Sequence, residues 1–346
     1  MLMQKEFVVL SPEQQQVICN FTISSAKRHL VLEGPAGTGK TLVALQVANN
    51  LMDAAENTVE GTDNEPILVV TAHYRNESDP IMKYMNATTG GGANKISKGW
   101  DDMKREFGVS GSLYKTHLLE LSEGLAKKWA GRDIVPIVDE IYRKALLSNL
   151  GEQSFPESVR MILIVNPDAR GRPLALPPSV LHVTLTIPYR STIAITSLAR
   201  FIAKCKNLVV PEGDFGSDVV GTKPLFFDVG LHERKLKEAL EHCYKHLGDN
   251  VTILYSGLPT EAIQNMVKNQ GKEEGGLWDC YYASDFYGWE AERVVAVTTG
   301  LNLMEQVTRA RTHLAVILSG DDPETKSHFQ QAAREGLVDA VHQSAN

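Results

Sequence analysis

The segment Gly34-Pro35-Ala36-Gly37-Thr38-Gly39-Lys40-Thr41 decides how the rest of this chain is interpreted. It follows an apolar run that ends at Glu33, and it opens a helical pattern. Glycines between a strand and a helix let backbone N–H groups converge on a phosphate, and the helix N-terminus adds a favourable dipole. The segment therefore predicts a phosphate-binding loop that lines a nucleotide site along its whole length. Lys40 is expected to contact the β- and γ-phosphates, and Thr41 to contact Mg²⁺.

A second run, Ile134-Val135-Pro136-Ile137-Val138-Asp139-Glu140, is an apolar strand that ends in two acids. A phosphate-binding loop needs one carboxylate for magnesium and another for the attacking water. We therefore expect Asp139 to join Thr41 as a magnesium ligand and Glu140 to act as the general base. Acids at a strand end are often only solvated, and it is the phosphate-binding loop that favours the catalytic interpretation here.

Short apolar runs alternate with helical patterns along the chain, which is typical of parallel sheets covered on both faces. The proline-rich stretch Arg172–Pro178 is expected to be a hinge between two domains, residues 1–176 and residues 177–346. Residues 74–132 leave room for a small insert, Asn86–Lys98 is expected to be a loop, and a closing helix is expected from Asp322. The expected strands are His29–Glu33, Ile67–Thr71, Ile134–Val138, Met161–Val165, Leu181–Leu185, Leu225–Phe227, Val251–Tyr255, Arg293–Thr298 and Leu314–Leu318. The expected helices are Thr41–Met52, Thr192–Lys206, His232–His246 and Thr260–Asn269.

The composition of the 346-residue chain is that of an ordinary soluble globular protein, with 43% apolar and 22% charged residues. Because the net charge is −7, any nucleic-acid site must be a local basic surface on an acidic body. No apolar run approaches the ~20 residues that a membrane-spanning helix needs. The cysteines show no metal-ligand spacing and are expected to be buried, reduced thiols. We therefore expect an intracellular, soluble protein with no membrane association.

Further motifs follow these two in the order found in superfamily 1 helicases of the UvrD/Rep kind, which the chain resembles from Leu10 to Arg311. The resemblance implies two RecA-like P-loop NTPase domains, with parallel sheets and a nucleotide cleft between them, that bind ATP and Mg²⁺. The motifs are Leu10-Ser11-Pro12-Glu13-Gln14, Val69-Val70-Thr71-Ala72, Pro188-Tyr189-Arg190-Ser191, Tyr287-Gly288-Trp289-Glu290 and Gln306-Val307-Thr308-Arg309-Ala310-Arg311.

The same resemblance implies roles for single residues in these motifs. Gln14 would hydrogen-bond the adenine edge, and Tyr189 would stack on the base. Glu290 would bind the ribose. Arg190 would contact the γ-phosphate, and Arg309 would be the arginine finger that stabilises charge in the transition state.

Some positions depart from the family pattern. Ile141 and Tyr142 follow the acidic pair, where the family usually carries Ala and then Gln, Asp or His, and the strand Met161–Val165 is not followed by the family's Gln. The residues that hold triphosphate and magnesium are thus kept, and those that couple hydrolysis to nucleic-acid movement are altered. Two functions stay open: an ATP-hydrolysing helicase-like enzyme acting on single-stranded DNA or RNA, and a helicase-derived regulatory switch that binds protein partners without unwinding. A kinase would explain the phosphate-binding loop but not the later motifs.

The insert Gly90–Arg132 is locally basic, and Trp100, Tyr114 and Trp129 are interleaved with its cations. Aromatic rings among cations are typical of surfaces that stack single-stranded bases. The alternative is an amphipathic helical insert whose aromatic side chains pack inward and whose lysines are solvated. Its basic residues are Lys95, Lys98, Lys104, Arg105, Lys115, Lys127, Lys128 and Arg132.

Overall fold

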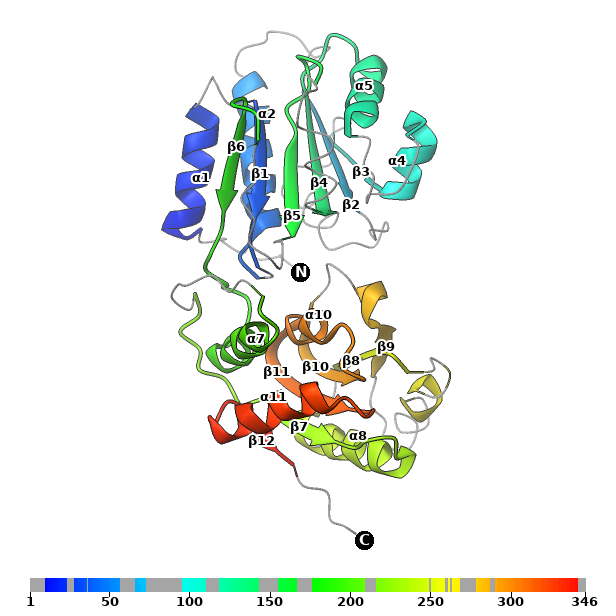
Figure 1. The fold of residues 1–346 in the computed structure, drawn as a ribbon. Helices are drawn as coiled ribbons and strands as arrows, with labels where there is room; N and C mark the ends of the chain where they lie inside the picture. Colours follow the sequence, from blue (N-terminus) through cyan, green and yellow to red (C-terminus); the bar gives the residue numbers. More distant parts are fainter. Residues whose placement is uncertain are drawn as a thin grey trace, which may run out of the picture. The chain divides into compact units, whose positions relative to one another are not determined.

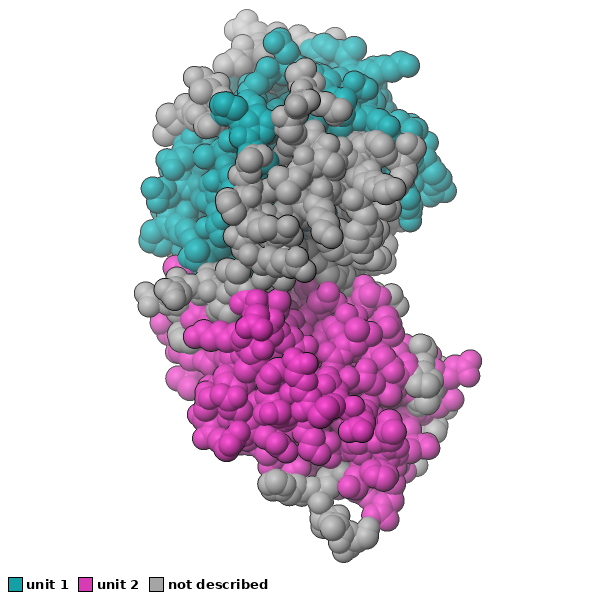
Figure 2. Space-filling view, viewed as in Figure 1, with its two compact units in different colours: residues 1–35, 39–168, 172–186 teal, residues 36–38, 169–171, 187–346 magenta. Residues whose placement is uncertain are grey.

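The protein forms two compact units, shown in different colours in Figure 2. Unit 1 comprises residues 1–35, 39–168 and 172–186, and unit 2 comprises residues 36–38, 169–171 and 187–346. The computed structural model describes residues 10–23, 28–35, 37–56, 66–72, 95–109, 118–142, 155–166, 176–208, 216–248, 250–258, 261, 263–267, 278–286 and 290–341. The expected boundary lies at 176/177. The strand that follows it, Val180–Thr184, pairs with His29–Glu33 of unit 1, and unit 1 therefore extends to Thr186.

Unit 1 is a parallel sheet with the strand order β3-β2-β4-β5-β1-β6 and helices on both faces (Figure 1). Alternate residues of β1 point to opposite faces. Leu30 and Leu32 pack with the helices α1 and α2, while Val31 packs with α4 and α5. The strands are β1 (His29–Glu33), β2 (Ile67–Ala72), β3 (Lys95–Gly99), β4 (Ile134–Tyr142), β5 (Ile162–Asn166) and β6 (Val180–Thr184). The helices are α1 (Pro12–Ile23), α2 (Lys40–Glu56), α4 (Trp100–Phe107) and α5 (Leu118–Lys128).

Unit 2 is a second parallel sheet, ordered β12-β7-β11-β10-β8-β9. One face packs against α7, α10 and α11, and the other packs against α8. The strands are β7 (Leu225–Asp228), β8 (Val251–Ser256), β9 (Asp279–Tyr282), β10 (Ala291–Thr298), β11 (Ala310–Leu318) and β12 (Asp339–Ala340). The helices are α7 (Ile193–Cys205), α8 (Glu233–Leu247), α10 (Leu303–Val307) and α11 (Pro323–Arg334), with a 3-10 turn, η3, at Ala283–Phe286.

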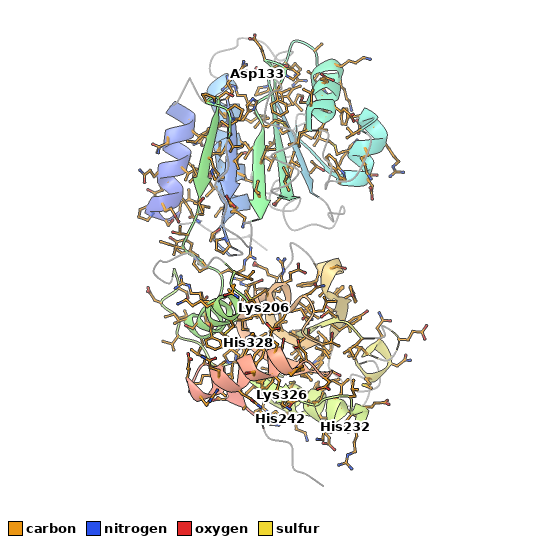
Figure 3. All side chains as sticks on the ribbon, viewed as in Figure 1. Asp133, Lys206, His232, His242, Lys326 and His328 are labelled. Atoms are coloured by element: carbon orange, nitrogen blue, oxygen red, sulfur yellow. The ribbon has the colours of Figure 1, made fainter. Side chains whose placement is uncertain are left out.

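Polar contacts of unit 2 fasten its helices to the carboxyl ends of the strands. Just after α7, the Lys206 ammonium donates to the Gly300 carbonyl, which follows β10, at 3.5 Å. Lys326 of α11 pairs with Asp228 at the end of β7, at 2.5 Å. Figure 3 labels both lysines. These contacts hold α7 and α11 at the carboxyl ends of the strands.

The expected fold class, two α/β domains with parallel sheets, is confirmed. Every apolar run expected as a strand is a strand, and the closing helix after Asp322 is present as α11. Residues 263–267 are helical, as expected. The expectation of a loop over Asn86–Lys98 was wrong from Lys95 onward, because that segment pairs with β2 as the edge strand β3. Residues 86–94 lie outside the described part of the chain.

No helix in the described ranges is long and apolar enough to cross a membrane. The same ranges contain no cluster of three or more His, Cys, Asp or Glu side chains suited to a metal ion. All four cysteines are free, and Cys243 is buried as expected. The expectation of burial was wrong for Cys19, which is exposed on α1.

Candidate functional site

The glycine-rich segment connects the end of β1 to the start of α2 at Lys40. Gly37 and Gly39 have φ values of 84° and 79°, which residues with a Cβ rarely adopt. A Cβ at Gly39 would also lie 2.4 Å from Gln14 Nε2, so this position has no space for a side chain. The local geometry is therefore that of a strand, a tight glycine turn and a helix N-terminus, which is the context a phosphate-binding loop requires. Ala36 lies outside the described residues.

Lys40 and Thr41 lie on the first turn of α2 and reach different partners. The Lys40 ammonium donates to the carbonyls of Gly34 at 2.7 Å and Pro35 at 2.9 Å, so it lies against the loop itself. The Thr41 hydroxyl donates to Asp139 Oδ2 at 3.0 Å, and Asp139 is only 4% exposed. A hydroxyl and a carboxylate side by side are hard oxygen donors of the kind that Mg²⁺ prefers. The structure thus brings together the two residues expected to bind magnesium.

The acidic pair Asp139 and Glu140 lies on an irregularity of β4. The pairing of β4 with β5 is shifted between Val138 and Ile141, so β4 carries an extra residue there. Such bulges re-aim side chains and are frequent next to active sites. Only the backbone of Glu140 is described, and its side chain lies outside the described part. On the neighbouring β2, the buried hydroxyl of Thr71 has no hydrogen-bond partner among the described residues.

Gln14 belongs to a capping box at the start of α1. Its Oε1 accepts from the Ser11 N–H at 2.9 Å, and its own N–H donates to Ser11 Oγ at 3.2 Å. The side-chain amide lies against Gly39 of the loop, and the residue is 4% exposed. Its neighbour Glu13 accepts from both the N–H and the hydroxyl of Thr186 at 3.0 Å, which ties α1 to the end of β6. No role was predicted for Glu13, because its partner Thr186 is 173 residues away in sequence.

Tyr189 and its neighbours are held by main-chain contacts within unit 2. The Tyr189 N–H donates to the Gly37 carbonyl at 2.9 Å, and the Ser191 hydroxyl donates to the Ala310 carbonyl at 2.6 Å. A Cβ at Gly216 would lie 2.3 Å from Cδ1 of Tyr189, so the ring packs directly on the Gly216 backbone. The structure therefore joins the Pro188–Ser191 motif to the glycine-rich loop and to the start of β11.

The remaining predicted residues of unit 2 are charged and close to other charges. The Arg190 guanidinium forms an ion pair with the Glu290 carboxylate. Arg309 is 9% exposed and follows α10. Burial raises the pKa of Glu305 above its ordinary value, while the nearby Arg309 charge acts in the opposite direction. Residues 287–289, which complete the motif before Glu290, lie outside the described residues.

A buried polar cluster around Gln306, close to Arg309 in sequence, was not predicted. Gln306 is fully buried, and its amide donates to the carbonyls of Leu254 at 2.8 Å and Val297 at 3.3 Å. These carbonyls belong to β8 and β10, so Gln306 fastens α10 to the two strands that flank it. The Ser256 hydroxyl donates to Gln306 Oε1 at 3.4 Å, and a polar residue within the final motif was the available signal for this cluster.

Among the described residues of the insert, Trp100 does not form part of the aromatic surface that was one of the two expected forms. Trp100 is 1% exposed and belongs to the core of unit 1, so it cannot stack on a base. Glu106 pairs with both Lys98 and Lys128, and these contacts lower the pKa of its carboxyl. Lys128 also lies over the rings of Phe107 and Trp129, at 5.4 Å and 4.6 Å from their centroids. Tyr114 and Lys115 lie outside the described residues.

Comparison with known proteins adds a family match for the N-terminal part of the chain. The family model described as "Type III restriction enzyme, res subunit" matches residues 7–99, which include the glycine-rich loop. A comparison with curated proteins found no match.

Solved structures similar to the chain include Saccharomyces cerevisiae Dbp5 bound to RNA and ADP BeF3, at 12% identity and a TM-score of 0.43, over 97% of this chain and 90% of that one. Another is a DEAD box protein from the hyperthermophile Methanococcus jannaschii, at 11% identity and a TM-score of 0.33, over 99% of each chain.

The glycine-rich loop and the parallel sheet around it are those of a P-loop nucleotide-binding core, and residues 7–99, which include the loop, are similar to the family named above. The narrower superfamily 1 assignment is not confirmed by the family match and stays a prediction.

Proposed function

We propose that the protein is a superfamily 1 helicase-like enzyme that hydrolyses ATP with Mg²⁺ and acts on single-stranded DNA or RNA. The observation that carries the proposal is the contact between the Thr41 hydroxyl and the buried Asp139 carboxylate, directly beside Lys40. Thr41 lies on the first turn of α2 and Asp139 lies on β4, and the two residues are 98 positions apart in sequence. A structural glycine turn would not require a magnesium-type donor pair beside it.

In this proposal the residues of unit 1 hold the triphosphate. Thr41 and Asp139 would bind Mg²⁺, which supplies positive charge that neutralises the phosphate oxygens. The Lys40 ammonium would exchange its carbonyl partners for β- and γ-phosphate oxygens, and the backbone of Gly34–Thr41 would line the phosphates, with N–H donors at every residue except Pro35. Glu140 would accept a proton from the attacking water.

Residues of unit 2 and of the α1 cap complete the proposed site. Arg190 and Arg309 would stabilise the charge that spreads over the γ-phosphate in the transition state. The Tyr189 ring is supported on one side by Gly216, which suits it to stack on a base. Gln14 would contact the adenine, and Glu290 the ribose.

Steady-state ATP hydrolysis with Mg²⁺, measured with and without single-stranded DNA and RNA, tests the proposal. Lys40→Ala should lower turnover by about 100-fold or more, roughly 2.7 kcal/mol of barrier, with an unchanged circular dichroism spectrum. Glu140→Gln serves as a second variant that is expected to be inactive. Stimulation of wild type by about tenfold with one strand type, roughly 1.4 kcal/mol, would identify the nucleic acid on which the enzyme acts. Undiminished turnover in Lys40→Ala would refute the site assignment.

A second candidate is a regulatory nucleotide switch that binds protein partners without unwinding. The burial of Trp100 and the pairing of Lys98 and Lys128 with Glu106 favour it, because they remove part of the expected nucleic-acid surface. Slow hydrolysis that neither DNA nor RNA changes, together with protein partners captured only in the ATP-bound state, would support the switch over the motor.

A further inference from the structure

The ion pair of Arg190 and Glu290 joins two segments that are far apart in sequence but belong to the same unit. Arg190 precedes α7, and Glu290 directly precedes β10. Their side chains are 28% and 33% exposed, so the pair is partly shielded from water. Charges in such a position attract one another more strongly than those of an open surface pair.

The main chain around Arg190 is fixed on both sides. Before it, the Tyr189 N–H donates to the Gly37 carbonyl, and a Cβ at Gly37 would lie 3.0 Å from the Arg190 Cβ. After it, the Ser191 hydroxyl donates to the Ala310 carbonyl at 2.6 Å. The Arg190 backbone is therefore held between Gly37 and Ala310 of its own unit, while its long side chain can rotate between rotamers.

A guanidinium has several N–H donors along its planar fork, and each edge of the fork holds one anion at a time. The Glu290 carboxylate occupies the Nε–H of Arg190, so a phosphate that approaches this edge competes with it. In the proposed function, Arg190 contacts the γ-phosphate. In the structure, its anion is the Glu290 carboxylate.

We propose that Glu290 limits the preference of the site for ATP over ADP, because its carboxylate holds the Arg190 guanidinium and a γ-phosphate must displace it. This inference rests on the proposed nucleotide site. It gives Glu290 a task different from the ribose contact that the sequence resemblance implies.

The two tasks have different thermodynamic consequences. A ligand that needs Arg190 must first break the pair. Its apparent affinity is therefore its intrinsic affinity multiplied by the fraction of molecules in which Arg190 is available. ADP has no γ-phosphate and leaves the pair intact. The ribose is common to both nucleotides, so a lost ribose contact weakens both and cancels in the ratio of their dissociation constants.

The experiment measures the dissociation constants of ADP and of a non-hydrolysable ATP analogue, with Mg²⁺, for wild type, Glu290→Gln and Glu292→Gln. Glu292 is the matched control, since it is two residues further along and pairs with Arg311 at 3.2 Å. The ratio of the ADP constant to the analogue constant should rise about fivefold in Glu290→Gln. It should change by less than about twofold in Glu292→Gln.

Repeating Glu290→Gln in an Arg190→Gln background identifies the partner. There the ratio should no longer respond to the change at Glu290. A ratio that does not rise in the single variant, or a rise that persists without Arg190, would overturn the inference while leaving the nucleotide site standing. Wild type that binds neither nucleotide would instead overturn the proposed function, and the inference with it.

Discussion

At residue scale, Gln14 joins the cap of a helix to the glycine-rich loop. Its Oε1 completes the capping box with Ser11, whereas its amide nitrogen lies against Gly39. Glutamate is an equally good partner in a capping box, because only the acceptor oxygen is needed, but it has no N–H to offer a base. The two tasks can therefore be separated by substitution.

We expect Gln14→Ala to lower the free energy of unfolding by about 1 kcal/mol, and Gln14→Glu to lower it by less than about half of that. Both variants should lose preference for ATP over GTP if the amide contacts adenine, as the resemblance implies. Urea unfolding without nucleotide gives the first quantity, and competition between ATP and GTP gives the second. Equal destabilisation by the two substitutions would contradict the capping role.

How far single site residues were predictable depends on what they contact. Lys40 and Thr41 lie where a glycine-rich turn meets a helix, and Asp139 follows a continuous apolar run within β4; sequence patterns mark both kinds of place well. Gln306 was missed because its amide nitrogen donates to backbone carbonyls, which every residue carries, and its oxygen accepts from Ser256, which is 50 residues away. Trp100 shows the opposite problem, since an aromatic ring among lysines has the same sequence signature in a core as on a binding surface.

At the scale of elements, the strands that were not predicted all lie at sheet edges. β3, β9 and β12 occupy outer positions in their sheets. Central parallel strands are covered on both faces and are therefore continuously apolar, whereas an edge strand such as Lys95–Gly99 has no such requirement. The short helix α10 was missed because five residues are too few for a clear helical period.

The first strand also carries a pH-dependent contribution to stability. His29 accepts a hydrogen bond at Nδ1 from the Met161 N–H, at 3.1 Å. Burial, helped by the charge of Arg28, lowers the pKa of His29 from 6.5 to about 4. Between these values the unfolded chain binds more protons than the folded one. This contribution is therefore complete above pH 6.5 and is lost as the pH falls towards 4.

The free energy of unfolding of wild type declines between pH 7 and pH 4, and His29 contributes up to about 3 kcal/mol of this decline. We expect His29→Asn to remove that contribution. Asparagine keeps an acceptor for the Met161 N–H but does not titrate. Urea unfolding of both proteins at several pH values in this range gives the difference. Parallel pH profiles would show that His29 does not contribute.

At the scale of the whole molecule, each unit has its own core on both faces of its own sheet. Domains with separate cores are expected to unfold as separate cooperative units. Phe329 of α11 is fully buried and stacks on Phe226 at 4.4 Å between ring centroids, so it belongs to unit 2 alone. Leu121 of α5 is equally buried in unit 1.

Phe329→Ala should destabilise unit 2 by about 3–5 kcal/mol, and Leu121→Ala should destabilise unit 1 by about 2–5 kcal/mol. Hydrogen exchange resolved by peptide measures each unit separately, and each variant should lose protection mainly in its own sheet. Equal loss of protection across both sheets in either variant would show that the two cores unfold as one.

The order of strands in the first sheet has a consequence for synthesis on the ribosome. β1, which leads into the glycine-rich loop, has its two neighbours in β5 and β6, and Glu33 is 149 residues before its partner His182. At roughly 5–20 residues per second, the nascent chain waits roughly 7–30 s before that partner exists. Until β5 is synthesised, late in this interval, an apolar strand has no neighbour to pair with, which makes the early nascent chain a natural client for chaperones.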